Sequence, residues 1–109
     1  MIGRPIRLKC NPVVAAALVY QAAMSRGFMV LDETPDGFHE KRQLVHRPGA
    51  NRELCEVVSF EDGRNGTQVN ALVRWKTTRR LDVINDLLAD VERLAQVANL
   101  LRREIGFRP

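Results

Sequence analysis

Two histidines and two cysteines are the residues of this sequence that could most readily hold a metal ion. His39 and His46 fall within one expected strand, where seven residues span about 23 Å and an odd spacing sends the two rings to opposite faces. Cys10 and Cys55 are too far apart in sequence for a motif of close cysteine pairs. We therefore expect no metal site and no cofactor, and reduced, packed cysteines.

The densest basic stretch runs from residue 74 to residue 80 and contains the single tryptophan, so it could contact nucleic-acid phosphates. We expect Trp75 to face the core instead, Thr78 to cap the following helix, and the basic side chains to be solvated. Nucleic-acid binding is thus a less favoured alternative. The residues that would carry it are Arg74, Lys76, Arg79 and Arg80.

Enzyme motifs do not stand out. No glycine-rich phosphate loop follows an expected strand, and no nucleophile elbow is present. Asp32, Glu33 and Asp36 form an acidic cluster, which a solvated turn explains better than acid–base catalysis. We favour a non-enzymatic domain and leave enzymatic activity open.

Length and composition favour one domain over residues 1–109. The apolar content of 45% is enough for a core, and no apolar run approaches the 18 or so residues of a membrane span. Basic residues precede the apolar run from Val13 to Tyr20, but Pro12 interrupts any resemblance to a signal peptide. We expect a soluble, cytoplasmic protein, and the net charge of +4 is dispersed along the chain.

The longest periodic pattern predicts a helix over residues 81–105. Apolar residues recur at intervals of three and four and define one broad face. They are Leu81, Ile84, Leu87, Leu88, Val91, Leu94, Ala95, Ala98, Leu101 and Ile105.

A second helix is predicted from Pro12 to Arg26. Asn11 is a suitable N-cap and proline is favoured in the first turn. Gly27 is suited to the left-handed backbone conformation that commonly follows the end of a helix. This helix is apolar nearly all round, so most of its circumference should be covered by the protein or by a partner. Strands are expected over residues 5–10, 28–34, 38–46, 53–61 and 67–76.

These elements predict an α+β domain with the order strand, helix, four strands, helix. Hairpins make the last four strands antiparallel neighbours, and the first strand adds beside the fifth, giving a five-stranded sheet ordered 2-3-4-5-1 with both helices on one face. The order of elements is similar in outline to TATA-binding-protein-like and helix-grip domains. That resemblance implies a long terminal helix across a curved sheet, and no activity.

Strand alternation predicts which side chains meet the helices. Val69, Ala71 and Trp75 share one face of the last strand, and a two-residue Asn65-Gly66 turn pairing Arg64 with Thr67 would add Val58 and Phe60 to it. The same pairing turns Glu56 inward near Trp75, where we expect it to reach water at the end of the sheet; the alternative is a buried carboxylate in a pocket. It leaves Val57 and Leu72 on the opposite face, as part of a surface that a partner could cover.

Two functional hypotheses follow from these patterns. The leading one is a non-enzymatic protein-binding or assembly domain, homo-oligomeric or bound to another protein, whose contacts use the apolar first helix or the outer sheet face at Val57 and Leu72. The alternative is a pocket for a small apolar ligand between the long helix and the sheet, lined by Tyr20, Glu56 and Trp75.

Overall fold

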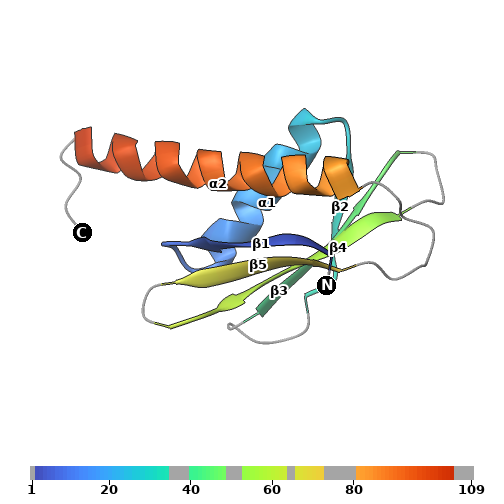
Figure 1. Cartoon of the computed structure of the whole chain (residues 1–109), viewed down its shortest axis with the longest axis horizontal. Helices are drawn as coiled ribbons and strands as arrows, with labels where there is room; N and C mark the ends of the chain where they lie inside the picture. The colour runs from blue at the N-terminus through green and yellow to red at the C-terminus, as the bar shows by residue number, and fades with distance from the viewer. Residues whose placement is uncertain (1, 35–39, 49–52, 64–65, 73–80, 105–109) are drawn as a thin grey trace.

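A computed structural model describes residues 2–34, 40–48, 53–63, 66–72 and 81–104. Two helices accompany five strands in the order β-α-β-β-β-β-α (Figure 1). The elements are β1 (Ile2–Leu8), α1 (Pro12–Ser25), β2 (Met29–Asp32), β3 (Glu40–His46), β4 (Glu53–Glu61), β5 (Thr67–Leu72) and α2 (Leu81–Glu104). No helix within these residues is both long and apolar enough to cross a membrane.

The five strands form one antiparallel sheet in the order β1-β5-β4-β3-β2, which confirms the predicted α+β fold and strand order. The core lies between the helices and one face of the sheet. α2 packs along β1 and α1, while α1 packs over β2, β3 and β4 (Figure 1). β1 and β2 are therefore the two edges of the described sheet.

Local signals define α1 as expected. The Asn11 side chain accepts a hydrogen bond from the Val14 N–H at 2.9 Å, and Pro12 occupies the first turn. Gly27 follows the helix with a φ of +81°, a conformation that costs glycine little. The helix ends at Ser25, one residue before the predicted end.

α2 follows its predicted periodicity from Ile84 to Ala95, where Leu87 and Val91 are also buried, whereas Leu81 at its start is exposed. Ala98 and Leu101 continue the same apolar face but are exposed. The reason is length, because the C-terminal end of α2 extends past the sheet (Figure 1). A periodic pattern cannot reveal where the opposing surface stops.

The register between β4 and β5 corrects the predicted faces of β4. Glu61 pairs with Thr67 and Val57 pairs with Ala71, whereas the expected turn paired Arg64 with Thr67. The partner of Thr67 is thus three residues earlier in β4 than expected. Because three is an odd number, this shift in register exchanges the two faces of β4. Val57 is fully buried under the helices, and its expected position on the outer face is wrong.

The β4–β5 connection spans residues 62–66, and its glycines explain why it is longer than a two-residue turn. The Asp62 N–H donates to the Gly66 carbonyl at 3.0 Å, and Gly63 has a φ of +72°. A Cβ atom at Gly66 would lie 2.6 Å from the Asp62 carbonyl oxygen. Arg7 of β1 closes the connection by donating to that carbonyl at 2.8 Å.

Buried polar side chains of the inner layer include those of Gln43 and Ser59. Gln43 of β3 donates to the Ala16 carbonyl of α1 at 2.8 Å and so links the sheet to the helix. Its Oε1 atom and the Ser59 hydroxyl are buried without a hydrogen-bond partner among the described residues. Leaving a buried polar atom without a partner costs about 1–3 kcal/mol.

Candidate interaction surfaces

The structure does not bring the predicted ligand-binding residues together. Tyr20 lies on the exposed side of α1. Glu56 pairs with Leu44 and Leu72 on the sheet face opposite the helices, because β4 has the corrected register. Trp75 lies outside the described residues, so the pocket between helix and sheet stays a prediction.

The predicted nucleic-acid residues Arg74, Lys76, Arg79 and Arg80 also lie outside the described residues. Leu72 is half-buried on the outer sheet face, where alternation placed it. Its role in a partner interface stays a prediction.

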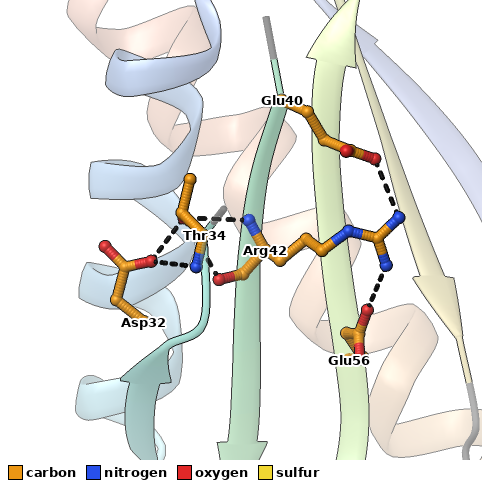
Figure 2. Close-up of polar contacts among 5 residues, drawn as sticks. All are labelled: Asp32, Thr34, Glu40, Arg42 and Glu56. Carbon is orange, nitrogen blue, oxygen red and sulfur yellow. Dashed lines mark hydrogen bonds and ion pairs between the residues drawn. The ribbon is translucent and has the colours of Figure 1, made fainter. Parts of the chain in front are cut away.

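An ion-paired cluster of three side chains occupies the outer sheet face (Figure 2). The Arg42 guanidinium lies 2.7 Å from Glu56 of the neighbouring strand β4 and 3.0 Å from Glu40 of its own strand. These hydrogen bonds, that with Glu56 first, raise the pKa of Arg42 above its ordinary value. The Glu56 side chain is 7% exposed and the Glu40 side chain 37%, so Arg42 compensates one buried carboxylate and one accessible carboxylate.

This cluster links β3 to β4 through the ion pair between Arg42 and Glu56. Each carboxylate accepts a charge-assisted hydrogen bond from the guanidinium. The sequence pointed to Glu56 as an unusual inward-facing acid, but the acid faces outward and its partner Arg42 was missed. The register of β3 against β4, which pairs Arg42 with Val58, is what reveals the partner.

A second group of polar contacts lies at the C-terminal end of β2 (Figure 2). Asp32 accepts hydrogen bonds from both the hydroxyl and the backbone N–H of Thr34, and these bonds, the hydroxyl first, lower the pKa of the Asp32 carboxyl. The Thr34 hydroxyl oxygen in turn accepts the Arg42 N–H at 3.1 Å. Asp32 of the predicted acidic cluster therefore stabilises the end of β2, while Asp36 lies outside the described residues.

The cysteines are poorly placed for nucleophilic chemistry. Burial raises the pKa of the Cys55 thiol to about 12 and also raises the pKa of Cys10. The thiolate is the reactive form, so neither side chain is activated. Within the described ranges, no three or more His, Cys, Asp or Glu side chains gather as metal ligands would.

An apolar line runs along the exposed side of α1, and we name it the α1 flank. Val13, Ala17, Tyr20 and Met24 recur at intervals of four, three and four residues, so they stand one above another. Val13, Tyr20 and Met24 are 54%, 49% and 44% exposed. An exposed line of this kind departs from the usual pattern, in which the apolar stripe of a helix faces the core.

The α1 flank faces away from α2. Arg26, at the end of α1, turns toward α2 and donates to the Asp86 carbonyl at 3.2 Å. Met24 precedes Arg26 by two residues and stands about 160° away round the helix. Because α2 lies along β1 while α1 packs over β2, β3 and β4, we infer that the α1 flank is on the β2 side of the molecule.

Other exposed apolar side chains include Val14 of α1 and Leu81 at the start of α2, and further ones lie at two places. Met29 and Leu31 of β2 are 46% and 53% exposed on the outer sheet face, whereas Leu44 and Val58 at the middle of that face are buried. Val97, Leu100 and Leu101 are exposed on the projecting end of α2.

Comparisons of this chain with protein-family models, with curated proteins and with solved structures give no match.

Proposed function

We propose that this chain is a non-enzymatic assembly domain that binds a second copy of itself, and that the α1 flank lies in the interface. The observation that carries the proposal is the uncovered line of Val13, Ala17, Tyr20 and Met24 on a helix whose opposite side is packed in the core. Contiguous exposed apolar surface of this kind marks interaction sites in folded proteins.

The pattern on α1 suits a second copy of the same helix. Intervals of four and three residues form the seam along which two helices pack face to face, and Ala17 in the middle permits close approach. A two-fold axis brings the same residues of both copies together, so an uncharged line is complementary to itself. Tyrosine and methionine are also enriched at protein interfaces.

The binding free energy expected from the α1 flank is too small for this surface to hold a dimer alone. Completing the burial of three half-exposed side chains on each chain is worth roughly 1 kcal/mol per side chain, or ~6 kcal/mol in all. Association costs at least about 4 kcal/mol in lost translational and rotational freedom. A micromolar dimer requires about 8 kcal/mol of net binding free energy, so further contacts must contribute.

Charge placed on the α1 flank tests the proposal. The Tyr20→Glu, Met24→Glu double variant would bury carboxylates in the interface, and we expect its dimer dissociation constant to rise at least ~100-fold. Ser25→Glu puts a carboxylate on the same helix about 100° away from Met24, and should change the constant less than ~3-fold. Sedimentation velocity over a range of concentrations gives the constants, and circular dichroism verifies folding.

Two results would contradict the proposal. The first is a native chain that sediments at its monomer mass of 12.4 kDa at every concentration up to the millimolar range. The second is a dimer whose dissociation constant responds equally to charge at positions 20 and 24 and to charge at position 25.

A further inference from the structure

The two edges of the sheet are protected to very different degrees. On β1, Pro5 removes one backbone donor, the pairing is irregular between Ile2 and Ile6, and the Arg4 N–H donates to the Asn85 side chain of α2 at 3.0 Å. Proline, irregular pairing and a covering helix are the means by which proteins prevent edge strands from pairing with other chains.

The β2 edge has no comparable protection among the described residues. The Glu33 N–H donates to the Arg42 carbonyl of β3, so odd-numbered residues of this strand direct their backbone groups toward β3. Alternation then directs the N–H and C=O groups of Val30 and Asp32 toward the open edge. The next outward group, the Thr34 N–H, is already bonded to the Asp32 carboxylate, which limits the open segment to β2 itself.

We propose that β2 pairs with β2 of a second copy, antiparallel and with Val30 opposite Val30, so that two sheets join into one ten-stranded sheet. This inference deepens the proposed function and rests on it. A strand that adds to its own copy satisfies the outward backbone groups of both chains at once, as β-augmentation does in other proteins.

Side-chain pairing selects the register. With Val30 on the two-fold axis, Met29 of each chain lies opposite Leu31 of the other on the outer face, so both exposed side chains become covered. A shift by one residue, which centres the pairing on Leu31, would place Met29 opposite Glu33. A shift by two residues would place the carboxylates of Asp32 directly opposite each other, which is destabilising.

The two parts of the interface are complementary. β2 is four residues long, or about 13 Å, too short to supply the 800 Å² or so that each partner buries in a stable complex. The α1 flank lies on the same side of the molecule, in the layer above β2. The two-fold axis that relates the paired strands therefore also brings the two α1 flanks together. The paired β2 strands supply the further contacts that the α1 flank alone lacks.

Cysteine crosslinking tests the proposed register. In the predicted pairing, Met29 and Leu31 of opposite chains form a non-hydrogen-bonded pair with Cα atoms about 4.5 Å apart, within the range for a disulfide. A mixture of M29C and L31C chains, oxidised with oxidised glutathione, should yield a species of twice the chain mass. Neither variant alone should do so, and the native chain, which keeps Cys10 and Cys55, is the control for background linkage.

Peptide mapping of the linked species and the mass in solution separate the outcomes. A link between the two introduced positions in the mixture supports the proposal. A dimer that forms no such link, or one in which L31C links only to itself, overturns the proposed pairing and leaves the proposed function standing. Variants and native chain that all remain monomeric would instead overturn both.

Discussion

The Arg42–Glu56 ion pair shows how one residue can be recognised as unusual from the sequence while its surroundings are missed. Alternation along β4 singled out Glu56 as an acid directed toward the helices, but the structure buries it on the opposite face of the sheet. Its partner comes from β3, fourteen residues earlier, and is adjacent only because of the strand register. Residue types alone do not contain that information.

The two carboxylates that accept hydrogen bonds from Arg42 provide a matched pair for measuring how burial strengthens an ion pair. Glu56→Gln weakens a charge-assisted bond to a buried group, and we expect the free energy of unfolding to fall by about 1–2 kcal/mol. Glu40→Gln changes an accessible partner of the same guanidinium and should cost less than about 1 kcal/mol. Urea unfolding of both variants measures the difference, and equal losses would show that burial of Glu56 does not strengthen the pair.

At the scale of elements, the helices and the strand order could be predicted because their signals are local. Asn11, Pro12 and Gly27 define the limits of α1, and the successive hairpins give the antiparallel order. The faces of β4 could not be predicted with the same success. An odd shift in pairing exchanges every side chain of a strand, and two glycines near Asn65 allow turns of more than one length.

The β4–β5 connection gives the sharpest test of the observed register. Gly66→Ala would place a Cβ atom against the Asp62 carbonyl oxygen, which is backbone and cannot move aside cheaply. We expect a loss of about 2–4 kcal/mol in the free energy of unfolding, combining overpacking with backbone rearrangement.

Gly27→Ala is the control for this substitution. Its φ of +81° imposes strain, but its Cβ would meet no atom within 4 Å, so the loss should be roughly 1–2 kcal/mol. Thermal or urea unfolding compares the two variants. If Gly66→Ala were the milder change, the two-residue Asn65-Gly66 turn would be the better description of this hairpin.

At the scale of the whole molecule, the two sides of the sheet have opposite characters. The β1 side is closed by α2, Pro5 and Asn85, whereas the β2 side combines an open strand with the α1 flank. The sequence indicated that α1 was too apolar to be fully solvated. It could not show which of its sides would stay uncovered, because that depends on where α2 packs.

Amide hydrogen exchange in β2 tests most directly the claim that a second copy covers this side of the molecule. The Leu31 N–H bonds to β3 within one chain, so it should be protected at any protein concentration. The Val30 N–H points to the open edge and should exchange rapidly in dilute solution. At concentrations where the dimer dominates, exchange occurs only from the remaining free monomer, so we expect it to slow at least ~100-fold once about 99% of the chains are bound. Exchange of Val30 that is equally fast at both concentrations, or already as slow as that of Leu31 in the dilute monomer, would contradict this account.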